Sequence, residues 1–268
     1  MCAAAHTHLA SISLDAIYSN NQEALRWKMS SEEHIRNLCY AGKQKKKAGF
    51  PLVWGGIRGD TLIDIGTGPS IYQLVSACES FKNIIATDFT DSNRQEFQKW
   101  LKSEPGSFDW SETLKTVCEI EGNRENWREK ENKLRATIKK VLKCDVTNSN
   151  PLHPEVLPKA DCLITALCLE TACKDIDAYK DAMRNITTLL KPGGHLVVIG
   201  VLGDSFYKVG KQKFFCLPLD EETVRNTVLN AGYTIKELDV FPIDNMSLHA
   251  DITDSYANFF LVAKKNLT

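Results

Sequence analysis

The chain has 268 residues, of which 43% are hydrophobic and 25% charged, and its formal net charge is -1. This balance is typical of a globular protein and gives no reason to expect nucleic acid as an obligatory partner. No apolar run reaches the roughly 18–20 residues that span a bilayer, so no membrane partner is expected.

The nine cysteines are an odd number and form no Cys-x-x-Cys pair. In a chain of this length, that pattern favours free thiols in a reducing compartment, and we expect the cytoplasm. Residues 1–14 lack the basic start and long apolar middle of a secretory signal. The six histidines do not cluster beyond His6 and His8, so no metal site is expected.

The chain is organised around a short apolar run that ends in two glycines. Leu62–Ile65 is short enough for a buried strand, and Gly66 and Gly68 end it at once. A helix over 70–78 would direct its free backbone N–H groups toward this glycine turn. A strand, a glycine turn and a helix in this order predict a docking place for a nucleotide-like ligand.

Strands and helices are expected to alternate along the rest of the chain. Residues 1–50 carry little periodic signal, with candidate helices over 14–27 and 31–40. Strands are expected over 61–65 and 83–87, up to 144–146, and over 160–167, 195–199, 234–241 and 258–264. Helices are expected over 70–78 and 92–102, twice within 109–142, and over 176–190 and 220–231.

This alternation predicts an α/β fold in which a mostly parallel sheet carries helices on both faces. The last two strands lack a helix between them, so one of them is expected to be antiparallel. We expect one main domain over 56–268, preceded by a divergent segment over 1–55.

Ligands of such sheets bind at the carboxyl ends of the strands, where four segments carry usable chemistry. Gly66 and Gly68 follow the first strand, and Asp88 ends the second, 22 residues after Gly66. An acidic side chain at that distance can hold both ribose hydroxyls of an adenosyl group. Asp145 ends the third strand, where it can accept a hydrogen bond from an adenine amino group, and residues 166–170 follow the fourth.

The glycine pattern separates two kinds of adenosyl ligand. A pyrophosphate dinucleotide needs a third glycine three residues after Gly68, and the chain has Ile71 there. A ligand with adenosine but no phosphate, such as S-adenosylmethionine, does not need this glycine. A nicotinamide-cofactor oxidoreductase is therefore the disfavoured alternative.

Five segments carry a family resemblance: Asp64–Leu74, Thr87–Phe89, Asn93–Glu96, Cys144–Val146 and Leu189–Leu196. With them, the chain from about Gly59 to Lys265 resembles the nicotinamide, phenylethanolamine and indolethylamine N-methyltransferases. The resemblance implies a Rossmann-like class I methyltransferase fold with a seven-stranded sheet whose last strand is antiparallel. It also implies S-adenosylmethionine as methyl donor and a small molecule as acceptor, and we expect a monomer.

The resemblance implies a donor site at matching positions of this chain. Gly66 and Thr67 would lie against the methionine part of the donor, Asp88 would hold the ribose, and Asp145 with Val146 would frame the adenine. The complete expected donor set is Tyr18, Gly66, Thr67, Tyr72, Asp88, Asn93, Asp145, Val146 and Ala166.

The resemblance is informative about the acceptor where branches of the family differ. Nicotinamide-methylating members carry an Asp after the fifth strand and a Ser further on, and this chain has Gly200 and Cys216 there. In the phenylethanolamine-methylating member two acidic residues face the substrate amine, and Glu170 and Asp204 stand at their positions.

These acids fit the chemistry of an amine acceptor. An aliphatic amine has a pKa of about 10 and must lose a proton before its lone pair can attack. We expect Glu170 and Asp204 to attract the cation, orient it and accept that proton. The competing interpretation makes Asp204 a turn residue and Glu170 a surface carboxylate at a helix start.

Other residues complete the expected acceptor site. A third acid of the phenylethanolamine branch falls on Thr253, with Asp254 one step away, and Tyr207 and Phe206 are expected to flank an aromatic ring. The expected catalytic residues are Glu170 and Asp204. The expected substrate-binding residues are Glu170, Asp204, Tyr207 and Asp254.

The first 55 residues match the family poorly. Members carry a tyrosine-rich lid there, and Tyr18 is the residue that we assign to it, without the paired tyrosines that should follow. A donor-binding relative with an impaired lid and no turnover is one alternative. A nicotinamide, pyridine or thioether methyltransferase is another.

Overall fold

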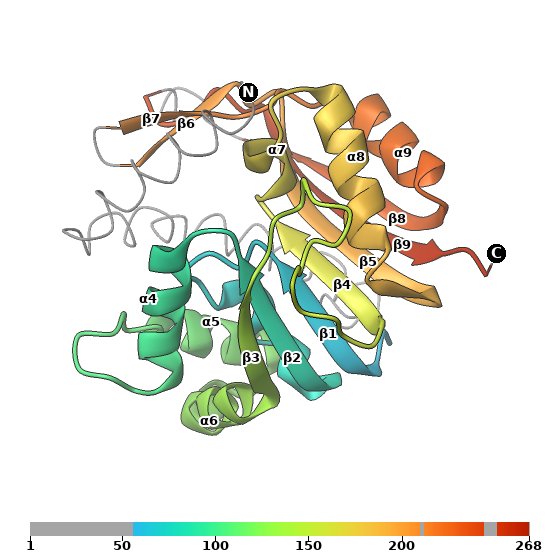
Figure 1. The fold of residues 1–268 in the computed structure, drawn as a ribbon. Coiled ribbons are helices and arrows are strands. Elements are labelled where there is room, and N and C mark those ends of the chain that lie inside the picture. The colour runs from blue at the N-terminus through green and yellow to red at the C-terminus, as the bar shows by residue number, and fades with distance from the viewer. Residues whose placement is uncertain (1–55, 210–211, 244–250, 268) are drawn as a thin grey trace.

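The computed structural model describes residues 56–209, 212–243 and 251–267 (Figure 1). Tyr18, the expected lid and the candidate helices over 14–27 and 31–40 lie outside these residues. The main sheet has seven strands in the order β3-β2-β1-β4-β5-β9-β8. Its strands are β1 (Gly59–Ile65), β2 (Phe81–Asp88), β3 (Ile138–Lys143), β4 (Ala160–Ala166), β5 (Leu190–Leu202), β8 (Tyr233–Pro242) and β9 (Ala257–Lys265).

Helices cover both faces of this sheet (Figure 1). They are α4 (Asp91–Leu101), α5 (Ser111–Glu121), α6 (Trp127–Thr137), α7 (Leu169–Ala172), α8 (Ile176–Thr187) and α9 (Glu221–Asn230). Successive side chains of β1 point to opposite faces, so Leu62 belongs to the apolar cluster that includes Trp100 of α4. Ile63 belongs to the second cluster, which includes Met183 of α8. The short apolar run of β1 is therefore buried on both sides.

The strand directions confirm the predicted fold. Strands β1 to β5 pair in parallel, whereas β9 pairs antiparallel with β5 and with β8. The chain passes from β1 outward through β2 to β3 and then returns to the other side of β1 with β4. This reversal places the glycine turn after β1 beside the end of β4, the usual position of a ligand in such sheets. No helix in the described part of the chain is long and apolar enough to cross a membrane.

The predicted helix over 70–78 is wrong. The segment forms two short 3-10 turns, η1 (Tyr72–Leu74) and η2 (Ala77–Glu79). The side-chain amide of Gln73 donates to Asp64 Oδ2 at 2.9 Å and lies 3.2 Å from the carbonyl oxygen of Thr67. These bonds hold the segment against the glycine turn. Side-chain hydrogen bonds to nearby groups compete with the backbone bonds of a regular helix, which is why the segment forms 3-10 turns instead.

Two other boundaries differ from the prediction. The end of the segment expected to be helical, 138–142, belongs to β3, an edge strand whose exposed lysines give it the composition of a polar helix. Residues 144–146 follow that strand rather than ending it. Helix α8 ends at Thr187 rather than at residue 190, and Leu190 already pairs with Ala160 of β4.

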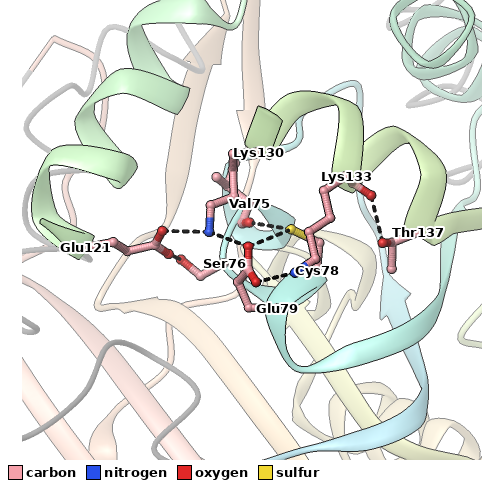
Figure 2. A network of polar contacts seen from close by, with 8 residues as sticks. All are labelled: Val75, Ser76, Cys78, Glu79, Glu121, Lys130, Lys133 and Thr137. Atoms are coloured by element: carbon pink, nitrogen blue, oxygen red, sulfur yellow. Dashed lines mark hydrogen bonds and ion pairs between the residues drawn. The ribbon is translucent and has the colours of Figure 1, made fainter. Parts of the chain in front are cut away.

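A network of charged side chains attaches the excursion over α5 and α6 to η2 (Figure 2). Lys130 of α6 pairs with Glu121 at 2.6 Å and with Glu79 at 2.8 Å. Glu121 also accepts a hydrogen bond from Ser76 at 2.8 Å, and Lys133 contacts Glu79. The excursion is thereby fixed to the turns that follow the glycine turn.

Candidate functional site

The glycine turn lies between β2 and the residues after β4. Gly66 has a φ of +74° and Gly68 a φ of +62°, a region that disfavours side chains. The N–H of Thr67 donates to the carbonyl oxygen of Thr87 at 2.8 Å. A Cβ on Gly66 would lie 2.2 Å from Cys168 Sγ. The turn is therefore held from both sides, and Gly66 leaves just enough room for Cys168.

Asp88 links this turn to the start of α4. Its Oδ2 accepts the N–H of Gly68 at 2.8 Å. Its Oδ1 accepts the N–H and hydroxyl of Thr90 and the side-chain amide of Asn93, all within 2.9 Å. Oδ2 accepts one hydrogen bond from the described residues, fewer than the lone pairs of a carboxylate oxygen allow, so it retains capacity for a ligand hydroxyl. Asn93 Oδ1 is buried and has no hydrogen-bond partner within the described residues.

Tyr72 follows the glycine turn as the first residue of η1, and two acidic side chains act on it. Burial raises its pKa, and the negative charges of Asp64 and Glu170 raise it further, so its hydroxyl stays neutral. Because both carboxyl groups act on one phenol, the glycine turn and Glu170 belong to the same local environment.

The remaining predicted donor residues follow β3 and β4. Asp145 Oδ1 accepts the N–H of Thr147 at 3.0 Å and its hydroxyl at 2.6 Å. Val146 is buried, and its carbonyl oxygen accepts an amide hydrogen from Asn185 at 2.9 Å. Ala166 is buried at the end of β4, and Leu167 after it has a φ of +52°, which is strained for a residue other than glycine.

Glu170 is a buried carboxyl group rather than a surface one. It stands in the first turn of α7 with 4% of its surface exposed. Its Oε1 accepts no hydrogen bond within the described ranges. Burial raises the pKa of Glu170 to about 7; the charge of Asp204 adds to the rise, and the N–H of Val201 opposes it. The competing interpretation, in which Glu170 is a surface carboxylate at a helix start, is therefore wrong.

Asp204 is also buried, with 5% of its surface exposed, in the loop after β5. Its Oδ1 accepts the hydroxyl of Thr253 at 2.6 Å. Burial raises the pKa of Asp204 to about 6, and the carboxyl group of Asp254 contributes. The structure thus brings the loops of Glu170 and Asp204 to one segment, although the two residues are 34 positions apart in sequence: the N–H of Leu217 donates to Glu170 O at 2.8 Å and that of Cys216 to Ser205 O at 3.1 Å. Asp254 is exposed and accepts the N–H of Ser205 at 2.7 Å.

Sequence reasoning missed the hairpin that carries Tyr207. Strands β6 (Phe206–Val209) and β7 (Gln212–Phe215) form a separate two-stranded sheet beside α7 in Figure 1. Tyr207 stacks on Phe214 with ring centroids 5.2 Å apart. Neighbouring residues of a strand point to opposite faces, so Phe206 and Tyr207 do not flank one ring together. Tyr207 stacks on Phe214, the residue that it pairs with across the hairpin. Two short runs of strand-forming residues, at 206–209 and 212–215, were the signal in the sequence that could have indicated this hairpin.

The thiols near the site serve as packing groups. Cys168 and Cys173 are buried or half-buried, and burial is the main cause that raises the pKa of both thiols. Within the described residues, no group of three or more His, Cys, Asp or Glu side chains is arranged to hold a metal ion.

Comparison with known proteins gives the family. The model of the NNMT/PNMT/TEMT family matches residues 49–266. The indolethylamine N-methyltransferase of Oryctolagus cuniculus is 54% identical over 79% of either chain. The nicotinamide N-methyltransferase of Sus scrofa is 53% identical over 78% of either chain. The phenylethanolamine N-methyltransferase of Macaca mulatta is 44% identical over 79% of this chain and 75% of its own.

Solved structures agree on the fold. A methyltransferase of Methanosarcina mazei has a TM-score of 0.55 and 13% identity, over 79% of this chain and 94% of its own. The 1,6-didemethyltoxoflavin-N1-methyltransferase of Burkholderia thailandensis has a TM-score of 0.53 and 14% identity, over 97% of this chain and 90% of its own. The resemblance found in the sequence is confirmed: this chain belongs to the NNMT/PNMT/TEMT family of S-adenosylmethionine-dependent small-molecule methyltransferases.

Proposed function

We propose that the chain transfers a methyl group from S-adenosylmethionine to the nitrogen of a small aryl-alkyl amine held by Glu170 and Asp204. One observation carries the choice of acceptor: two buried carboxyl groups, Glu170 and Asp204, lie after β4 and β5. One segment ties their loops together, because the N–H of Cys216 donates to Ser205 O at 3.1 Å and that of Leu217 to Glu170 O at 2.8 Å. Burying charge without a counter-ion is costly. A cationic amine between them would supply the missing positive charge.

The residues around the glycine turn fit the donor. Gly66 lets the turn pack closely against Cys168, Asp88 Oδ2 can accept a ribose hydroxyl, and Asn93 offers a buried oxygen without a partner in the described part of the chain. We propose that Gly66, Thr67, Asp88 and Asn93 bind the donor. Tyr18, Tyr72, Asp145, Val146 and Ala166 complete the proposed set.

The chain's contribution to the reaction is positioning and proton acceptance. When bound, S-adenosylmethionine supplies a methyl group on a sulfonium, which the nitrogen lone pair displaces in line. Glu170 and Asp204 have raised pKa values near neutral pH, which suits groups that bind an ammonium and then accept its proton. Tyr207 and Phe214 form an aromatic surface that supports binding of an aryl group, and Asp254 lies next to this site.

The lining argues against nicotinamide as the preferred acceptor. A Cβ on Gly200 would lie 2.5 Å from Phe259 Cε1, so the Asp of nicotinamide-methylating members does not fit here. Overall identity does not decide the matter, because the indolethylamine and nicotinamide relatives are 54% and 53% identical to this chain. The acceptor must be inferred from the residues of the site.

We also propose that the protein acts as a cytoplasmic monomer with no nucleic acid partner. The seven cysteines within the described residues are all free, which supports a reducing compartment. Residues 1–55 are proposed to form a lid over a methyltransferase domain at 56–268.

Transfer of a labelled methyl group to a panel of aryl-ethylamines, pyridines and thioethers tests the proposal. We expect turnover of the amines, and absence of amine turnover would refute it. Calorimetry of donor binding on the same preparation identifies the alternative, a silent relative, which would bind the donor and methylate no acceptor.

A further inference from the structure

The side chain of Gln73 holds the glycine turn from within the protein. Its amide nitrogen donates to Asp64 Oδ2 at 2.9 Å and lies 3.2 Å from both the carbonyl oxygen and the hydroxyl of Thr67. The carbonyl oxygen of Ser70 lies 3.3 Å from the same nitrogen. One buried amide therefore contacts the end of β1, the turn itself and the segment that follows the turn.

The acceptors around this amide fix its orientation. A backbone carbonyl oxygen carries no hydrogen, so the atom that faces the carbonyl groups of Thr67 and Ser70 must be the nitrogen. The other atom of the amide, Gln73 Oε1, is buried and has no hydrogen-bond partner among the residues that the structure describes. Burying an oxygen in this way costs free energy. The chain sustains this cost at the place where the nitrogen holds the turn.

Gln73 and Asp88 hold one peptide unit of the turn from its two sides. The carbonyl oxygen of Thr67 accepts from Gln73 and, at 3.0 Å, from the hydroxyl of Ser70. The N–H of the same peptide unit, on Gly68, donates to Asp88 Oδ2 at 2.8 Å. Because a peptide unit is planar and its C=O and N–H point in opposite directions, these contacts fix the direction in which the unit faces.

We propose that Gln73 is a positioning residue for the methyl donor, because its amide holds the peptide unit between Thr67 and Gly68 in the orientation that receives the methionine part of S-adenosylmethionine. This inference rests on the proposed binding of that part at Gly66 and Thr67. It does not depend on the identity of the acceptor.

The adenosine part of the donor is served by other contacts. Asp88, the proposed ribose ligand, is also held through Oδ1 by the N–H and hydroxyl of Thr90 and by the side-chain amide of Asn93. None of these bonds involves Gln73. Loss of the Gln73 amide should therefore weaken the binding of the methionine part more than the binding of adenosine.

Calorimetry with two ligands tests this inference without any acceptor. S-adenosylhomocysteine carries the amino-acid part of the donor, whereas methylthioadenosine keeps the adenosine and the sulfur but lacks that part. Gln73→Met preserves the approximate length of the side chain and removes the amide. We expect its affinity for S-adenosylhomocysteine to fall by about tenfold or more, and its affinity for methylthioadenosine to stay within about twofold of the wild-type value.

A second variant and two controls complete the experiment. Gln73→Glu keeps the size of the side chain, but an ionised carboxyl group cannot donate a hydrogen bond, so the same difference between the ligands is expected. Gln95→Met, at an exposed position of α4, should bind both ligands like the wild-type protein. Lys130→Met removes the ion pairs with Glu79 and Glu121 and thereby loosens η2, yet it should leave both affinities within about twofold.

Four results would overturn the proposal. They are equal losses for the two ligands, wild-type affinity for S-adenosylhomocysteine in both Gln73 variants, failure of both variants to fold, and the same difference between the ligands in Lys130→Met. The third would mean that the amide serves the fold as a whole, and the fourth that any loosening of the segment has this effect. A wild-type protein that binds neither ligand would refute the proposed donor site and, with it, the basis of this inference.

Discussion

Gly66 and Cys168 contact each other across the ends of β1 and β4, so closely that a Cβ added to Gly66 would lie 2.2 Å from Cys168 Sγ. Cys168 is the N-cap residue of α7, whose first turn carries Glu170. The glycine turn and the acidic group are therefore positioned by one contact. A change at either residue should affect the donor and acceptor parts of the site together.

Gly66→Ala should weaken donor binding by more than tenfold. The new Cβ would collide with Cys168, and alanine disfavours the φ of +74° found there. Gly106→Ala is the matched control, because Gly106 has a φ of +81° but no atom within 4 Å of a Cβ. The control should lose about 1–2 kcal/mol of stability without losing donor affinity. Calorimetry that finds equal donor affinities in both variants would contradict the assignment of this turn.

Glu170 should make the unfolding free energy depend on pH. Its pKa is about 7 in the folded protein and 4.5 as a free group, so folding favours the protonated form. This contribution is present in full below pH 4.5 and is lost as pH rises through 7. At about 1.4 kcal/mol per pKa unit, the loss amounts to a few kcal/mol.

Glu170→Gln should remove that dependence. Without donor or acceptor, the Tm difference between about pH 5 and pH 8 should be smaller in Glu170→Gln than in the wild-type protein. Glu222→Gln, an exposed position in α9, should retain the wild-type difference. Parallel pH profiles for the wild-type protein and Glu170→Gln would show that Glu170 is ionised in the free protein.

Gly200→Ala should destabilise the fold and disturb the acceptor site. The added Cβ would lie 2.5–2.6 Å from the Phe259 ring and 3.2 Å from Glu170 Oε1. Overpacking of this kind costs about 1–3 kcal/mol. Adding Phe259→Leu should restore part of the lost stability, since the smaller side chain leaves room. A Gly200→Ala protein with wild-type stability in denaturant titrations would mean that Phe259 moves freely.

Lys130→Met should cost more stability than Lys133→Met, although both lysines contact Glu79 (Figure 2). The Lys130 side chain is 10% exposed and also pairs with Glu121, whereas that of Lys133 is 50% exposed. We expect a loss of about 1–3 kcal/mol for Lys130→Met. For Lys133→Met we expect less than about 1 kcal/mol. Equal losses in urea unfolding would show that the network does not fix the helical excursion.

The predictable parts of the fold are those with a local signal. The hydrophobic pattern and the positions of the glycines were enough to predict β1, its turn and the alternation of strands and helices. They also placed Asp88 at the end of a strand, where the structure has it. The lysine-rich β3 was mistaken for a helix because an edge strand exposes the same residues as a polar helix. The segment after the glycine turn was mistaken because the bonds of Gln73 to Asp64 and Thr67 depend on the fold.

The candidate site was predictable in its residues but not in its environment. A carboxylate at a helix start looks the same in sequence whether it is solvated or buried, so the burial of Glu170 required the structure. The bond from Thr253 to Asp204 spans 49 positions, and no local pattern signals it. The roles of Tyr18 and the lid stay predictions, because these residues lie outside the described ranges.

The most direct test of the proposed function is kcat/KM for methyl transfer to 2-phenylethylamine, compared between the wild-type protein, Glu170→Gln and Asp204→Asn. Glu222→Gln serves as the exposed control. We predict that each buried-carboxyl variant loses about 100-fold or more in kcat/KM, a loss typical of a general base, while donor affinity is retained. Wild-type kcat/KM in both variants, or a wild-type preference for nicotinamide over the amine, would contradict the proposal.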